Sequence, residues 1–130
     1  MSEHEQETVD MLMQGMEAFR QGNLQSILDI FSDDVDFQHP MIGKLKGLEH
    51  IAKFIAGMIE RVKFEKFEPL EIIAQGDKVV IIVFEKLRIK ANGRSVDNEY
   101  VQVFTVKGNK VVQWRVYEDT APIVKAYSEN

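Results

Sequence analysis

The 130-residue chain contains no cysteine and only three histidines. The lack of cysteine excludes disulfides, thiolate nucleophiles and cysteine-ligated zinc, and it is consistent with a reducing compartment. The histidines, at positions 4, 39 and 50, lie far apart and form no HxxxH or HxxE set. We therefore expect no metal site.

Other signals are missing as well. No apolar run approaches the roughly 18–20 residues of a membrane span, and the start, MSEHEQETVD, lacks the basic and apolar regions of a signal peptide. The chain has no P-loop, GxGxxG or GxSxG motif, so we expect no cofactor and disfavour a serine hydrolase. Together these absences predict a soluble cytoplasmic protein with no membrane partner.

The composition is that of one globular domain spanning residues 1–130, with 45% hydrophobic and 28% charged residues. The net charge is −5, which argues against a nucleic-acid partner because such proteins need a concentrated basic face. Residues 1–36 contain nine acids and one base, whereas residues 37–130 contain fifteen bases and twelve acids. We expect the acidic start to be a solvated surface.

The first part of the chain has helical periodicity. Apolar residues from Val9 to Phe19 recur at i, i+3, i+4 and i+7, Gly22 ends this predicted helix, and Asn23 caps a shorter one. Residues 32–34 are interpreted as a loop, residues 35–39 as a short strand that ends at Pro40, and residues 47–62 as a third helix.

From residue 64 onward the pattern is that of strands. We predict strands at 64–74, 78–90, 96–106 and 110–118, with turns at 76–77, 92–93 and 108–109. Pro69 indicates an edge or a bulge in the first of these strands, and Thr120 is expected to cap a short terminal helix. Helices followed by meandering strands predict an α+β fold with helices on one face of an antiparallel sheet.

The centre of the 78–90 strand is apolar on both faces. One face can pack against the helices, but the other also needs cover. A second subunit is the expected source, so we predict a homodimer through the outer face of the sheet.

Two polar residues lie on faces that are otherwise apolar. His39 continues the Val35–Phe37 face, where it is either a core histidine with satisfied hydrogen bonds or a pocket residue. Glu85 interrupts the most apolar strand on the same face as Leu87, where it either meets solvent or enters a cavity.

Three further positions are candidates near the end of the sheet. Asp119 follows the last strand on the same face as Tyr117; it either caps the terminal helix or supplies a carboxylate at a pocket mouth. Tyr100 and Gln102 share one strand face, where they either add polar contacts to a pocket or pack as ordinary sheet residues.

Three segments together carry a family resemblance: QGNLQSILDIFSDDVDFQHP, GLEHIAKFI and NEYVQVFTVKGNKVVQWRVYEDT. The chain resembles the SnoaL-like group of the nuclear transport factor 2-like superfamily, which also contains ketosteroid isomerases and limonene-epoxide hydrolases. The resemblance implies a cone: a curved antiparallel sheet wrapped around N-terminal helices, with an apolar pocket at the open end. It also implies dimers through the outer sheet face.

The resemblance to ketosteroid isomerases places His39 where those enzymes keep an aspartate general base, just before a proline. Their oxyanion-hole tyrosine would fall near Gly15 or Met16, neither of which can donate a hydrogen bond from its side chain. Their second acid would fall near Val101 or Gln102. The isomerase machinery is therefore incomplete in this sequence.

The resemblance to epoxide hydrolases matches Glu85 and Asp119 to the two aspartates that flank the attacking water. The arginine of those enzymes would fall at Val83, however, and Phe37 replaces a tyrosine that binds water. In SnoaL-type cyclases an aspartate near the end of the last strand is the acid/base, and Asp119 matches that position.

These observations favour a pocket protein that performs acid/base catalysis of the isomerase, cyclase or hydratase/hydrolase type on a small apolar carbonyl compound. His39 is the expected base, Asp119 the acid or orienting partner, and Glu85 the third candidate. The expected lining residues are Met16, Phe37, Ile55, Met58, Ile59, Leu87, Tyr100, Gln102 and Tyr117. The alternatives are a non-catalytic binding or accessory domain that uses the same pocket and a protein-interaction domain that uses the open sheet face.

Overall fold

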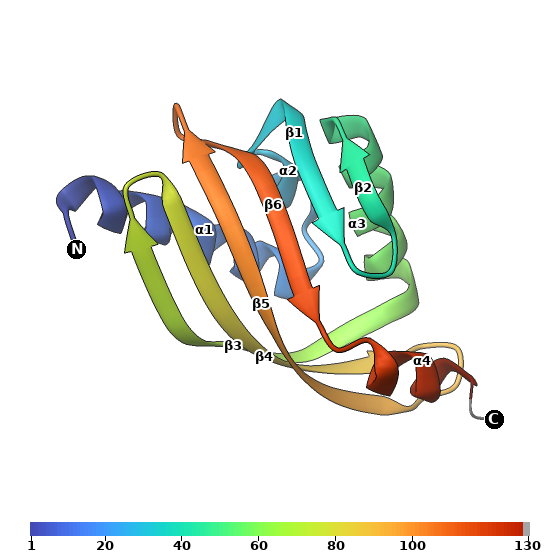
Figure 1. Cartoon of the computed structure of the whole chain (residues 1–130). Coiled ribbons are helices and arrows are strands. Elements are labelled where there is room, and N and C mark those ends of the chain that lie inside the picture. Colours follow the sequence, from blue (N-terminus) through green and yellow to red (C-terminus); the bar gives the residue numbers. More distant parts are fainter. Residues whose placement is uncertain (129–130) are drawn as a thin grey trace.

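A six-stranded curved sheet carries three helices on its concave side, and a fourth helix lies at one end of the sheet (Figure 1). The computed structural model describes residues 1–128. The elements are α1 (Glu3–Gln21), α2 (Leu24–Leu28), β1 (Phe31–His39), β2 (Gly43–Lys46), α3 (Leu48–Arg61), β3 (Val62–Gln75), β4 (Lys78–Ile89), β5 (Ser95–Lys107), β6 (Lys110–Glu118) and α4 (Ala121–Ser128). The predicted α+β class is confirmed.

Local sequence signals explain several of these boundaries. Ser2 and Glu5 form a reciprocal capping box at the start of α1. Gly22 ends the helix in the left-handed conformation, with a φ of 72°. Gly108 and Asn109 both have positive φ, 58° and 60°, as a tight two-residue hairpin between β5 and β6 requires.

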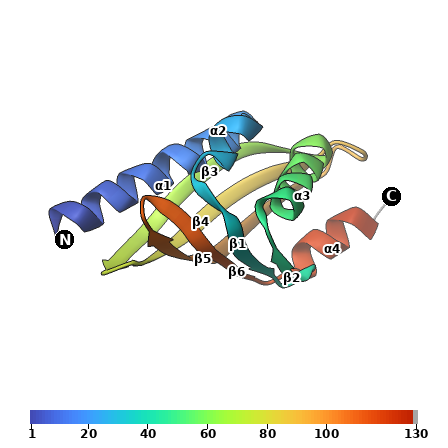
Figure 2. The ribbon, with the colours of Figure 1, turned by 90° about the horizontal axis from the view of Figure 1, so that it is seen from above.

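The strand order is β2-β1-β6-β5-β4-β3, and β1 pairs in parallel with β6 while the other neighbours are antiparallel. This order places an early strand beside the last one, so that His39 at the end of β1 lies near Glu118 at the end of β6. Viewed from above, α1, α2 and α3 lie on the same side of the sheet (Figure 2). Their apolar faces and the concave sheet face form the core.

One expectation about this part of the chain was wrong, and one short strand was missed. The predicted loop at residues 32–34 belongs to β1, whose register with β6 shifts between Phe31 and Asp36. The short strand β2 was not predicted, because its four residues are mostly exposed and carry no apolar alternation. Pairing with β1 makes it a strand.

The edge strand β3 shows both features expected around Pro69. It pairs only with β4, and its register shifts between Pro69 and Glu71 and again between Phe64 and Lys66. Such irregularities increase local bend and twist, and they help the sheet to curve around the helices. Within residues 1–128, no helix is long and apolar enough to cross a membrane.

Candidate functional site

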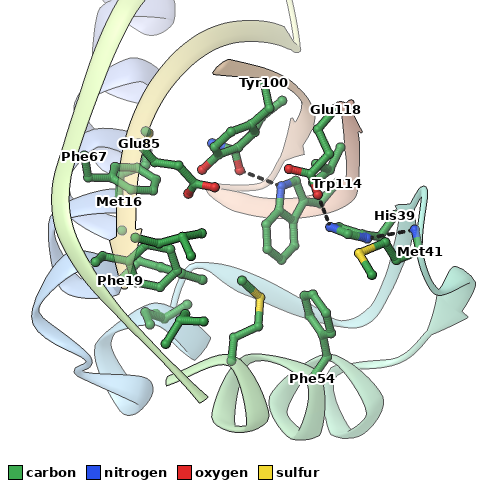
Figure 3. Close-up of a pocket in the computed structure, with 18 of the residues that line it drawn as sticks. Met16, Phe19, His39, Met41, Phe54, Phe67, Glu85, Tyr100, Trp114 and Glu118 are labelled. Atoms are coloured by element: carbon green, nitrogen blue, oxygen red, sulfur yellow. Dashed lines mark hydrogen bonds and ion pairs between the residues drawn. The ribbon is translucent and has the colours of Figure 1, made fainter. Parts of the chain in front are cut away.

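The concave face of the sheet and helices α1, α3 and α4 enclose a cavity of about 330 Å³ (Figure 3). This volume is at the lower end of the roughly 300–1,000 Å³ typical of small-molecule sites. Four lining residues are exposed and mark its mouth: Met41, Ile42, Arg61 and Tyr127. The wall is mostly aromatic rings and thioethers, from Met16, Phe19, Phe31, Phe54, Met58, Phe64, Phe67, Phe104 and Trp114.

Polar side chains enter this apolar space from three neighbouring strands. His39 comes from β1, Glu118 from β6 and Tyr100 from β5, where Tyr100 is paired with Glu118 across the ladder. Glu85 enters from β4. In Figure 3 the side chains of Glu85, Tyr100 and Glu118 point into the same part of the cavity.

His39 is fixed by a hydrogen bond at each ring nitrogen. Its Nδ1 accepts a hydrogen bond from the backbone N–H of Met41 at 3.1 Å, so the ring proton is on Nε2. That Nε2 lies 3.0 Å from Oε1 of Glu118 and donates to it. Neither nitrogen is free to accept a proton from a ligand, because Nδ1 already accepts a hydrogen bond and Nε2 carries the ring proton.

Asn98 bridges the two carboxyl groups of the cavity. Its Nδ2 donates to Oε2 of Glu118 at 2.8 Å. The same side chain also hydrogen-bonds Glu85, its partner across the β4–β5 ladder. Asn98 is only 6% exposed, so its amide can serve only partners inside the protein. Glu118 therefore accepts two N–H donors, one from His39 and one from Asn98, and is oriented by both.

Glu85 is 5% exposed, and burial raises the pKa of its carboxyl group from the ordinary 4.5 to about 8. The negative charge of Glu118 raises this pKa further, while hydrogen bonds from Asn98 and Tyr100 oppose the shift. Burial and the two carboxyl groups also raise the pKa of the Tyr100 hydroxyl well above 10. At neutral pH both groups keep their protons, so Glu85 is a hydrogen-bond donor beside the carboxylate of Glu118.

Gln102 and Trp114 form a second polar contact in the wall. The indole Nε1 of Trp114 donates to Oε1 of Gln102 at 2.9 Å, which fixes the orientation of the amide. Gln102 is 3% exposed, and its Nε2 has no hydrogen-bond partner among residues 1–128.

The structure brings two of the three candidate catalytic residues, His39 and Glu85, to the cavity. Five of the predicted lining residues also reach it: Met16, Met58, Leu87, Tyr100 and Gln102. Four others do not lie among the lining residues. Phe37 and Ile55 are fully buried in the core, Ile59 packs against that core, and Tyr117 is 46% exposed on the outer sheet face.

The expectation that Asp119 enters the pocket was wrong. It is exposed, and its Oδ1 accepts a hydrogen bond from the backbone N–H of Ala121 at 3.0 Å. Asp119 therefore satisfies a backbone N–H at the start of α4, close to the capping role that was its alternative interpretation. The cavity instead receives Glu118, one residue earlier.

A signal in the sequence could have identified Glu118. Trp114 and Val116 are the apolar residues of the last strand that point inward, and alternation from them places Glu118 on the same face. The role of Asn98 had no such signal, because it depends on the register between β4 and β5. Within the described residues, no group of three or more His, Asp or Glu side chains is placed to hold a metal ion.

The raised pKa of Glu85 makes stability depend on pH. The folded state keeps the proton of Glu85 up to about pH 8, whereas the unfolded chain releases it near pH 4.5. The folded state therefore gains stability from this proton below pH 4.5, and that stability is lost as the pH rises to about 8. Glu85→Gln removes this pH-dependent part of the stability, because glutamine does not titrate. We expect the stability of Glu85→Gln relative to wild type to rise by roughly 3 to 5 kcal/mol between pH 5 and pH 9.

Urea unfolding at both pH values measures this difference. Glu99→Gln, at an exposed position on the neighbouring strand, controls for the loss of one carboxylate. A constant difference between Glu85→Gln and wild type across this range would contradict protonation of Glu85 in the folded state.

Comparisons with known proteins agree with this fold. An NTF2-like protein from Burkholderia xenovorans is 27% identical, with a TM-score of 0.79 over 93% of this chain and 95% of that one. An LEH-like epoxide hydrolase from M. tuberculosis is 20% identical, with a TM-score of 0.81 over 95% and 90%. A proposed isomerase from Bacillus subtilis is 14% identical, with a TM-score of 0.89 over 100% and 98%.

Among curated protein sequences, none matches this chain. The family model of the SnoaL-like domain matches residues 13–114, which include the second half of α1, all of α2 and α3, and all of β1 to β5. Because this match covers most of the chain and the structural neighbours share the fold, the protein belongs to the SnoaL-like domain family.

Proposed function

We propose that the protein catalyses proton transfer on a small apolar carbonyl compound, with Glu118 as the base and Glu85 as the acid. The observation that carries this proposal is that two carboxyl groups, bridged by Asn98, share one apolar cavity in which burial raises the pKa of Glu85 to about 8. An enzyme needs both forms together to remove a proton from carbon while it donates one to oxygen.

In the proposed reaction, Glu118 removes a proton from the carbon next to the carbonyl group. Negative charge then develops on the carbonyl oxygen, which accepts a hydrogen bond or a proton from Glu85. Return of the proton from Glu118 to a different carbon moves a double bond, and attack of the enol on a second carbonyl group closes a ring. His39 and Asn98 act as positioning residues, because they hold the Glu118 carboxylate without touching the substrate.

The apolar wall supports this chemistry in two ways. Aromatic rings and thioethers offer contact surface to the body of an apolar ligand and no competing hydrogen bonds. Exclusion of water strengthens the electrostatic interactions of the two carboxyl groups with the reacting atoms.

Exchange of carbon-bound hydrogen for deuterium tests the base without knowledge of the natural substrate. The probes are 1-indanone and 4-phenyl-2-butanone in D₂O, followed by NMR at the carbon next to the carbonyl group. We expect the protein to accelerate exchange and Glu118→Gln to lower the accelerated rate at least about a hundredfold. His39→Ala should lower it less, because the base itself remains.

Asp119→Asn is the matched control, since it changes a neighbouring carboxylate that accepts a backbone N–H at the start of α4 and lies outside the cavity. Binding of both ketones with no exchange above the buffer rate would contradict catalysis and favour the non-catalytic binding domain. Equal rates for Glu118→Gln and wild type would exclude Glu118 as the base.

The pH profile of the same exchange tests the acid. Because Glu85 must be protonated to donate, the rate should fall as the pH rises through about 8, the pKa of Glu85. Glu85→Gln should remove this alkaline decline and lower the maximal rate. An alkaline decline that persists in Glu85→Gln would assign it to another group.

We also propose a homodimer through the outer face of the sheet. Apolar side chains project there from four strands: Ile73, Val80, Ile82, Phe84, Val101, Val103 and Tyr117. Ile73 and Tyr117 are 58% and 46% exposed, which favours a partner surface.

Analytical ultracentrifugation tests the dimer. We expect wild type to sediment as a dimer and Ile82→Asp as a monomer, because the new charge would be buried at the interface. Gln14→Asp, which adds the same charge on the exposed side of α1, should remain dimeric. A monomeric wild-type protein contradicts the proposal.

A further inference from the structure

Arg61, the last residue of α3, borders the cavity. It is the one lysine or arginine among the lining residues that the structure describes. The side chain is exposed, and it forms no ion pair with a carboxylate within residues 1–128. A side chain with a positive charge and no ion pair therefore borders a cavity whose wall is mostly apolar.

Gly57, one turn earlier in α3, makes room for this group. A Cβ atom at position 57 would lie 2.9 Å from Nη1 and 3.6 Å from Cζ of Arg61, and its three nearest neighbours all belong to that guanidinium. Gly57 has no positive φ, so the backbone does not need a glycine there. Glycine inside a helix is destabilising relative to alanine. In the structure, the absence of a side chain at Gly57 leaves space for the guanidinium of Arg61.

The polar groups of the cavity are divided between its depth and its mouth. Glu85 and the side chain of Glu118 are 5% and 6% exposed, whereas Arg61 is exposed like Met41 and Tyr127 at the opening. An anionic group placed deep in the cavity would meet the carboxylate of Glu118 in a medium of low dielectric constant. An anionic group at the mouth would meet Arg61 instead.

We propose that Arg61 is a carboxylate-binding subsite, and that the ligands of this protein are apolar molecules with a carboxylate at the end that stays at the mouth. The planar guanidinium can bind a carboxylate with two parallel hydrogen bonds. The apolar body then enters the cavity toward Glu85 and Glu118. This inference rests on the part of the proposed function that places an apolar ligand in the cavity, and not on catalysis.

Binding of 4-phenylbutanoate and of its uncharged amide tests the subsite. The chain has one tryptophan, and Trp114 lines the cavity, so its indole N–H resonance reports occupancy. At pH 7 and low salt we expect wild type to bind the carboxylate about tenfold more tightly than the amide. In Arg61→Gln the two affinities should become equal, mainly through loss of carboxylate binding.

Arg88→Gln is the matched control. It removes the same charge from β4. Arg88, however, projects on the outer face of the sheet, where it forms an ion pair with Glu65. The preference for the carboxylate should persist in this variant. Its loss in Arg88→Gln as well would mean that net charge, not the subsite, attracts the carboxylate.

Gly57→Ala separates binding from stability. The added methyl group should displace the guanidinium and reduce the preference severalfold, while the midpoint of thermal unfolding stays the same or rises by a few degrees. A structural role of Gly57 alone would leave the preference unchanged. Equal binding of both probes by wild type, an unchanged preference in Arg61→Gln, or no response of Trp114 to either probe would overturn the proposal. Each of these results is independent of whether ketones exchange hydrogen.

Discussion

Two carboxyl groups buried in an apolar cavity constrain the whole site. Glu85 and Glu118 approach one another from β4 and β6, and a low-dielectric space does not favour two negative charges. The chain resolves this by keeping the proton on Glu85 and by surrounding Glu118 with N–H donors from His39 and Asn98. In the proposed reaction, the different environments of the two groups make Glu85 the acid and Glu118 the base.

The sheet topology makes this arrangement possible. Because β1 pairs in parallel with β6, His39 and Glu118 reach the same end of the sheet from positions far apart in the chain. The β4–β5 register then places Asn98 beside Glu85. The four residues converge because the neighbouring strands β1, β6, β5 and β4 present them on the concave side of the curved sheet.

The two carboxyl groups lie deep in the cavity, and Arg61 lies at its mouth. This division suggests the direction in which a ligand would enter. Arg61 lies at the end of α3, where a positive side chain also interacts favourably with the helix C-terminus. A ligand held at both ends would present a defined carbon atom to Glu118, which is what proton transfer to carbon requires. Arg61 at the rim would then orient the ligand, and the carboxyl groups of the sheet would transfer the proton.

The sequence by itself determined the elements and which faces they bury. Helical spacing, Gly22 and the Gly108–Asn109 turn act through neighbouring residues, so they predicted α1 and the β5–β6 hairpin, and alternation placed His39 and Glu85 on inward faces. The tertiary structure decided which groups meet. Strand β2 depends on pairing with β1, Asn98 on the register of β5 with β4, and the contact of His39 with Glu118 on the parallel pairing of β1 with β6. Such choices are made by hydrogen bonds and packing between distant segments, and no local spacing records them.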